Sequence, residues 1–177
     1  GNDIFFGGAG TDTMVGGAGD DQYYVQNSGD TGDIISENAF GGNDRIFASV
    51  SYELPSVSEI ETLSTDSNAG VNAINLRGSD SANIVIGNNG VNRLNGAGGN
   101  DILYGLGGTD YFAFSTAPNG ASNIDTIVGF TSVDDLFFLD DAIFASLSPG
   151  TVAAVYFRSA ANAVSATGAE RIVHNST

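Results

Sequence analysis

The chain has 177 residues, of which 25 are glycine, and it contains neither cysteine nor tryptophan. Five basic residues, all arginine, stand against 21 acidic ones, so the formal net charge is -16. This balance excludes the basic surface that nucleic acids require and any attraction to anionic membranes. The missing cysteines exclude a disulfide framework, and no apolar run reaches the roughly 18 residues of a membrane span. Cations are the natural partners.

A nine-residue pattern repeats at the start of the chain. It reads Gly-Gly-x-Gly-x-Asp-x-apolar-x twice over residues 7–24, and residues 1–6 match its second half, so Asp3, Asp12 and Asp21 are nine residues apart. Glycine tolerates positive φ and lets a turn direct several carbonyl oxygens inward, while carboxylate oxygens are ligands that Ca²⁺ prefers. The pattern predicts calcium-binding turns that alternate with short strands.

Two such units make one coil of about eighteen residues, and turns on the same side then stack about 4.8 Å apart. This spacing predicts that Asp3 lies over Asp21 and that Asp12 lies over Asp30. A cation between stacked turns would collect carboxylates from one turn and carbonyls from the next. Without the cation these like charges repel, so we expect a metal-dependent fold.

The repeated phrase resembles the repeats of the RTX family, the secreted calcium-binding nonapeptide proteins. The resemblance implies an all-β fold, namely a right-handed parallel β-roll (a β-helix-like solenoid) with several Ca²⁺ ions in its Gly/Asp-rich turns and additional strands capping its C-terminal end. It also implies attached domains and type I secretion machinery as partners, and a secreted, extracellular location in bacteria.

The glycine spacing lapses after residue 24. Glu37 and Asp44 flank a Gly-Gly turn between apolar strand pieces, so they could hold a further cation, and a solvated turn is the alternative. Residues 46–64 alternate apolar with polar side chains, which predicts strands with Pro55 at a turn. We expect this segment to be scaffold without a site of its own.

The period returns in residues 78–113, where the aspartate place reads Asn83, Asn92, Asp101 and Asp110. Asparagine offers a carbonyl oxygen without charge, so we expect weaker or empty sites at the two Asn turns. An Asn ladder could instead hold these turns together by side-chain hydrogen bonds. Calcium is expected at the two Asp turns.

Two later strands are predicted in residues 125–130 and 134–139. They resemble the segment that closes RTX rolls, which implies calcium ligation by Asp125 and Asp135. Solvated strand ends are the alternative for both carboxylates. Asp134 is interpreted as surface charge.

These segments define the expected domains and ligands. The expected domains are a first roll block (1–47), bridging strands (48–77), a second roll block with closing strands (78–141) and C-terminal capping strands (142–177). The expected metal ligands are Asp3, Gly8, Gly10, Asp12, Gly17, Gly19, Asp21, Asp30, Glu37, Asp44, Asn83, Asn92, Gly99, Asp101, Gly108, Asp110, Asp125 and Asp135.

No catalytic constellation is found in the sequence, and we expect no enzyme in this chain. His174 is the only histidine, and no Gly-x-Ser-x-Gly elbow or phosphate-binding Gly-x-x-x-x-Gly-Lys-Ser/Thr loop occurs. The leading hypothesis is a calcium-binding domain that folds on Ca²⁺ outside the cell and supports secretion and stability of an attached domain. The alternatives are a structural or adhesive spacer of a surface protein and an accessory module of a polysaccharide-acting enzyme.

Overall fold

The computed structural model describes residues 1–27, 32–117, 121–140, 142–144, 157–159 and 172–174. Asp30 lies outside these residues, as does most of the predicted capping segment. No helix in the described part of the chain has the length and hydropathy of a membrane span.

The described chain forms sixteen short strands joined by turns. They are β1 (Ile4–Phe6), β2 (Thr13–Val15), β3 (Gln22–Val25), β4 (Ile34–Ser36), β5 (Arg45–Ala48), β6 (Tyr52–Glu53), β7 (Thr62–Thr65), β8 (Leu76–Arg77), β9 (Ile84–Ile86), β10 (Arg93–Asn95), β11 (Ile102–Tyr104), β12 (Tyr111–Phe114), β13 (Thr126–Val128), β14 (Leu136–Leu139), β15 (Phe157–Ser159) and β16 (Ile172–His174).

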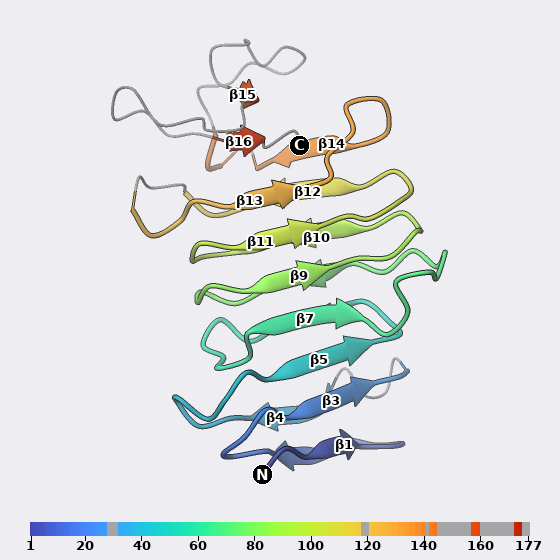
Figure 1. The fold of residues 1–177 in the computed structure, drawn as a ribbon, viewed down its shortest axis with the longest axis vertical. Coiled ribbons are helices and arrows are strands. Elements are labelled where there is room, and N and C mark those ends of the chain that lie inside the picture. Colours follow the sequence, from blue (N-terminus) through green and yellow to red (C-terminus); the bar gives the residue numbers. More distant parts are fainter. Residues whose placement is uncertain (28–31, 118–120, 141, 145–156, 160–171, 175–177) are drawn as a thin grey trace.

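The strands wind into a parallel β-solenoid, as the sequence predicted (Figure 1). Odd-numbered strands from β1 to β13 form one continuous parallel ladder, which β16 and β15 extend. Even-numbered strands from β2 to β14 form the opposite wall, with the ladder β6-β8-β10-β12-β14 and the separate pair β2-β4. The unbroken odd ladder joins both repeat blocks through the bridging segment, so they form one roll.

Coil length follows the sequence pattern only where the nonapeptide is intact. Ile4 pairs with Gln22 and Leu94 with Leu76, both offsets of eighteen residues. Gln22 pairs with Arg45, an offset of 23, because both connections of that coil, 26–33 and 37–44, are longer than a repeat turn and β3 has four residues. In irregular coils the strands therefore still pair with their neighbours, and most of the extra residues lie in the turns.

The core is one column of inward side chains along each wall. A three-residue strand turns only its central side chain inward, because successive side chains point to opposite faces. The buried column of the odd wall consists of Tyr23, Ile46, Leu63, Val85, Leu103 and Ile127. Each fully buried Leu or Ile stabilises the fold by about 1.5–3 kcal/mol, so the columns hold the coils together from inside.

The even wall is interrupted between β4 and β6, which are not paired. β6 has only two residues, and the following turn contains Pro55, which has no N–H for a ladder bond. A cavity lies at this interruption.

Candidate metal centres

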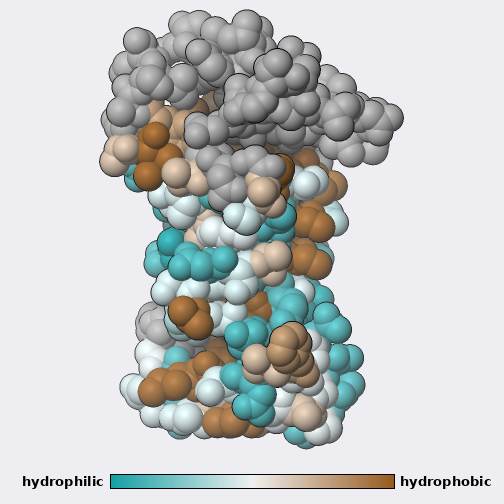
Figure 2. All heavy atoms as spheres, turned by 90° about the vertical axis from the view of Figure 1, so that its left-hand side faces the viewer, coloured by the Kyte–Doolittle hydropathy of each residue, from teal (hydrophilic) through white to brown (hydrophobic). Residues whose placement is uncertain are grey.

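The turns lie in two stacks, one on each side of the solenoid (Figure 1). Turns that follow even-numbered strands are called even turns, and those that follow odd-numbered strands are called odd turns. Among the described residues, the even turns include 16–21, 37–44, 54–61, 78–83, 96–101, 115–117 and 121–125, and the odd turns include 7–12, 26–27, 32–33, 49–51, 66–75, 87–92, 105–110 and 129–135. Figure 2 shows the side with the even turns, where hydrophilic residues run between separate hydrophobic ones.

An acid or amide at the end of each repeat turn is bonded to the neighbouring coil. One side-chain oxygen accepts the backbone N–H of the equivalent residue one coil earlier in the chain. The bonds run from Asp3 to Asp21 (2.6 Å), Asp12 to Asp33 (2.8 Å), Asp21 to Asp44 (2.9 Å), Asn83 to Asp101 (2.7 Å), Asn92 to Asp110 (2.9 Å), Asp101 to Asp125 (3.2 Å) and Asp110 to Asp135 (3.0 Å). These bonds fix each carboxylate inside the stack of turns.

The other oxygen of several of these carboxylates has no hydrogen-bond partner although it is buried. The five orphaned atoms are Oδ2 of Asp12, Asp21, Asp33, Asp44 and Asp101. Burying an ionised carboxylate without a partner costs several kcal/mol. Among the described residues the one ion pair joins the N-terminal ammonium to Asp3, so no arginine neutralises these groups. A bound cation would remove the cost, and Ca²⁺ takes such oxygen ligands.

Asp21, Glu37 and Asp44 form the densest of these groups. Their ligand oxygens all lie within 4.8 Å of one another, and they belong to two adjacent even turns. The hydroxyl of Tyr23 donates a hydrogen bond to Oε1 of Glu37, while Oε2 of Glu37 accepts the N–H of Gly17 over 2.9 Å. Asp21 and Asp44 each have one oxygen without a hydrogen-bond partner. Together with Glu37 they make a group of three carboxylates that fits a divalent cation.

The backbone of Gly16 lies close against this cluster of carboxylates. A Cβ on Gly16 would overlap Oδ2 of Asp21, Oε1 of Glu37 and the hydroxyl of Tyr23. The turn can approach the carboxylates this closely only because residue 16 has no side chain.

A matching pair of acids lies on the odd side of the first block. Asp12 and Asp33 stack there, and both leave Oδ2 buried without a partner. Asp30, which was predicted to lie over Asp12, is outside the described residues, and the carboxylate that accepts the N–H of Asp12 is that of Asp33. Thr13 pairs with Ile34 at an offset of 21 residues. Asp33 directly precedes β4, as Asp12 directly precedes β2.

The glycines predicted to offer carbonyl oxygens adopt the left-handed backbone that a tight turn needs. All six have positive φ, from 86° to 131°: Gly8, Gly10, Gly17, Gly19, Gly99 and Gly108. Their role as ligands stays a prediction.

The second block holds two further acidic pairs, Asp101 with Asp125 and Asp110 with Asp135. Burial raises the pKa of Asp110 to about 6, and burial also raises the pKa of Asp101 and of Asp125. Asp135 differs from the others because its second oxygen accepts the N–H of Thr131 over 2.8 Å. Of these four carboxylates, Asp101 has the orphaned oxygen.

Asn83 and Asn92 are buried and bonded to protein groups at both ends of the amide. Oδ1 of Asn83 accepts the N–H of Ser79 (2.7 Å), and its Nδ2 donates to the carbonyl of Ile60 (2.7 Å). Asn92 repeats this with Asn88 (2.8 Å) and Ile74 (2.9 Å). The Nδ2 bonds to Ile60 and Ile74 therefore hold adjacent coils together, as predicted for side-chain hydrogen bonds at these turns. Asn83 and Asn92 lie in opposite stacks of turns, so they do not stack on each other as a ladder.

Two acids of the stacks were not among the predicted ligands. Oδ1 of Asp33 accepts the N–H of Asp12 over 2.8 Å, and Oε2 of Glu61 accepts the N–H of Asp44 over 2.7 Å. Both precede a strand in the phrase acid-x-apolar, as Asp3 and Asp44 do. Counting back from the strand would have found them, whereas counting nine residues from the previous aspartate does not.

One comparison with known proteins gave a match. A family model described as the RTX calcium-binding nonapeptide repeat matches residues 1–25 and 77–112, in four copies. No curated protein and no solved structure matches the chain. The matched ranges contain the turns of Asp12, Asp21, Asp101 and Asp110, while Asp33, Glu37 and Asp44 lie outside them.

Proposed function

Because this chain carries the calcium-binding nonapeptide repeats of the RTX family, we propose that it is a calcium-dependent folding domain that becomes ordered outside the cell. In this role it supports the secretion and the stability of a domain attached to it. Repeats of this family bind Ca²⁺ and are generally structural modules rather than catalytic ones.

The observation that carries the proposal is the set of buried, unpartnered carboxylate oxygens in the turns. In the folded chain these oxygens have exchanged water for a protein interior that offers them no positive partner. Calcium binding supplies that partner in the folded state, while an unfolded chain has no assembled site. The ion therefore stabilises only the folded form, by about 2.7 kcal/mol per site when its concentration is one hundred times the dissociation constant.

The formal charge of -16 acts in the same direction. At the low Ca²⁺ concentration of a cytosol, repulsion between the turn carboxylates opposes the compact state. An expanded chain suits passage through a narrow exporter of the type I class. At the higher Ca²⁺ concentration outside the cell, the same sites fill and the roll closes, which favours one direction of transport.

The test compares the chain in EGTA and in millimolar Ca²⁺ by circular dichroism and small-angle X-ray scattering. We expect loss of β signal and a larger radius of gyration in EGTA, both reversed by Ca²⁺ and not by Mg²⁺, which demands octahedral geometry and dehydrates reluctantly. A chain that is equally compact and equally β-rich in EGTA would contradict calcium-dependent folding.

A second candidate function is a structural or adhesive spacer that calcium only stiffens. The amides of Asn83 and Asn92 favour it, because they join the central coils without an ion. Amide hydrogen exchange separates the two functions. In a folding switch, β1–β4 and β11–β14 lose protection in EGTA, whereas in a spacer every strand keeps most of its protection.

A further inference from the structure

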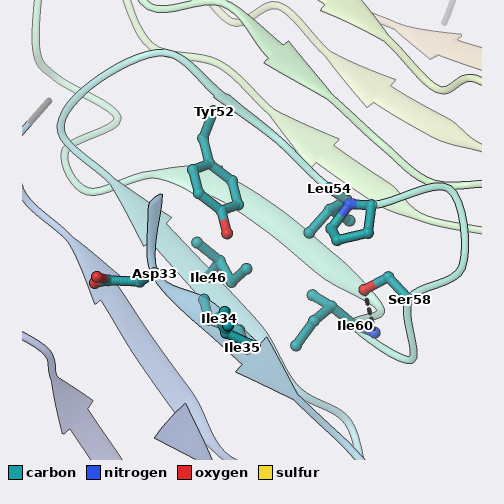
Figure 3. Close-up of a pocket in the computed structure, with 9 residues that line it drawn as sticks. Asp33, Ile34, Ile35, Ile46, Tyr52, Leu54, Ser58 and Ile60 are labelled. Atoms are coloured by element: carbon teal, nitrogen blue, oxygen red, sulfur yellow. Dashed lines mark hydrogen bonds between the residues drawn. The ribbon is translucent and has the colours of Figure 1, made fainter. Parts of the chain in front are cut away.

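The interruption between β4 and β6 encloses a cavity of about 130 Å³ (Figure 3). Its buried walls are Ile46, Leu54 and Ile60, each at most 3% exposed. Its rim includes Ile34, which is 57% exposed, so the cavity opens at the edge of β4. This is a hollow in the core that communicates with the surface.

The hydroxyl of Tyr52 is directed into this hollow. Tyr52 is 6% exposed, and in Figure 3 its hydroxyl points toward Ile46, with Ile34 and Ile35 beyond it. No described residue makes a hydrogen bond to that oxygen. Burial raises the pKa of Tyr52, so its hydroxyl stays protonated and can donate. A hydroxyl that faces the cavity and that no described residue bonds marks the place where a ligand would gain a hydrogen bond.

Two other residues of the lining, Ser58 and Asp33, have polar side chains. Oγ of Ser58 accepts the N–H of Ile60 over 3.3 Å, as the dashed line in Figure 3 shows. Asp33 turns its carboxylate away from the cavity toward Asp12, whose N–H it accepts. The negative charge of Asp33 at the wall disfavours anionic ligands, and the apolar walls disfavour any ion.

We propose that this cavity is a binding site for a neutral, ring-sized apolar molecule that carries one hydroxyl group. Apolar cavities of about 150 Å³ stay dry and bind benzene in other proteins, so the volume fits one six-membered ring. The four isoleucines contact the ring, and Tyr52 donates its hydrogen bond to the hydroxyl oxygen of the ligand. A single water is a poor alternative because it needs two to four polar partners.

The chain provides its own probes for the test, since four isoleucines line the cavity: Ile34, Ile35, Ile46 and Ile60. We would label isoleucine methyl groups with ¹³C, keep the chain in Ca²⁺, and titrate phenol. The four cavity methyls are expected to shift together with one dissociation constant in about the millimolar range, as suits seven non-hydrogen atoms. Ile84, Ile102 and Ile127 should not shift, and they report that the chain is folded.

Two variants and two further ligands test the role of Tyr52. Tyr52→Phe removes the hydroxyl and keeps the ring, so phenol should bind about two- to tenfold more weakly while benzene binds unchanged. Benzoate should not bind. Leu54→Phe fills the hollow and should abolish phenol binding with the distal methyl signals intact.

Several results would overturn the proposal. It fails if phenol leaves the four cavity methyls in place, or if distal and cavity methyls shift alike. It also fails if Tyr52→Phe leaves the affinity for phenol unchanged, or if a water contact to Tyr52 persists at saturating phenol. The proposal does not rest on calcium-dependent folding, because a chain folded with or without Ca²⁺ can be titrated in the same way.

Discussion

Asp21 and Asp44 lie in neighbouring coils, and the N–H of Asp21 donates to Oδ1 of Asp44 over 2.9 Å. The N–H of Asp3 donates to Oδ1 of Asp21 in the same manner. In Asp21 and in Asp44, Oδ1 accepts a hydrogen bond from the neighbouring coil, and Oδ2 is buried without a partner. A substitution at Oδ2 can therefore remove a cation ligand while the bond between coils remains.

Asp21→Asn removes the cation ligand and keeps the bond between coils, because the amide retains Oδ1 as an acceptor and has an NH₂ donor in place of Oδ2. We expect the Ca²⁺ affinity of the site with Glu37 and Asp44 to fall on the order of tenfold, or about 1.4 kcal/mol, since one of three carboxylates is lost. Isothermal titration calorimetry measures the change. Asp20→Asn is the matched control, as Asp20 is exposed and alters the net charge equally. Equal losses in both variants would show that overall charge, and not the cluster, sets the affinity.

Substitutions at Gly16 and Gly8 test two different requirements of a calcium turn. Gly16 tests the need for space beside the carboxylates, and Gly8 tests the need for a positive φ. Gly16→Ala would place a methyl group on the ligand oxygens of Asp21 and Glu37, so we expect loss of this calcium site. Gly8→Ala meets no atom within 4 Å, but its φ of +86° is strained for alanine. It should lower stability in Ca²⁺ by about 1–2 kcal/mol and leave the affinity of the Gly16 site unchanged. Calcium titration and thermal unfolding give the two readouts, and a lost site in Gly8→Ala would contradict this division.

Acid should partly substitute for calcium in folding. Burial raises the pKa of Asp44 and of Asp110 from 3.8 to about 6, so the folded state holds protons that the unfolded state has released. Stability without Ca²⁺ is therefore highest below pH 4 as far as these groups are concerned, and it falls as the pH rises from about 4 through 6. Thermal unfolding in a chelator at pH 5 and pH 8 checks this, with a higher midpoint expected at pH 5. With Ca²⁺ bound the difference should shrink, because the ion replaces the protons. A midpoint that rises with pH in the chelator would contradict the account.

The architecture could be predicted because the same local rule acts in every coil. A glycine turn, an acid or amide, and a strand with one inward apolar residue occur together at Asp3, Asp12, Asp21, Asp101 and Asp110. The predicted stacking of Asp3 with Asp21 is confirmed by their hydrogen bond. The calcium-binding nonapeptide repeats are matched by a family model over residues 1–25 and 77–112, and the parallel solenoid is confirmed.

The positions of Asp33 and Glu61 could not be predicted by counting nine residues from the previous aspartate. Turns with extra residues still deliver the next strand to the ladder, since strand pairing and burial set the register and the turn length does not. The cavity under Tyr52 has no signal in the sequence either. It arises where β4 and β6 fail to pair, which depends on how two irregular turns meet in space.

Asp101 and Asn83 occupy equivalent places in adjacent even turns, and exchanging their side-chain types should exchange their dependence on calcium. In Asp101→Asn the new amide can donate to the carbonyl of Ala82, as Asn83 donates to that of Ile60. We expect stability in EGTA to rise by about 1 kcal/mol, because an orphaned carboxylate oxygen becomes a bonded amide. The stabilisation by Ca²⁺ should shrink because this turn loses its charged ligand.

Asn83→Asp is the reciprocal change. It removes the donor to Ile60 and buries a charge beside Asp101, so stability in EGTA should fall by about 1–3 kcal/mol. Added Ca²⁺ should recover most of that loss, because two stacked carboxylates now face the same turn. Urea unfolding with and without Ca²⁺ measures both variants, and Asp134→Asn, at an exposed acid, controls for net charge. If Asp101→Asn destabilises the calcium-free chain, or if Ca²⁺ does not rescue Asn83→Asp, the amide turns are not the metal-free equivalent of the acid turns.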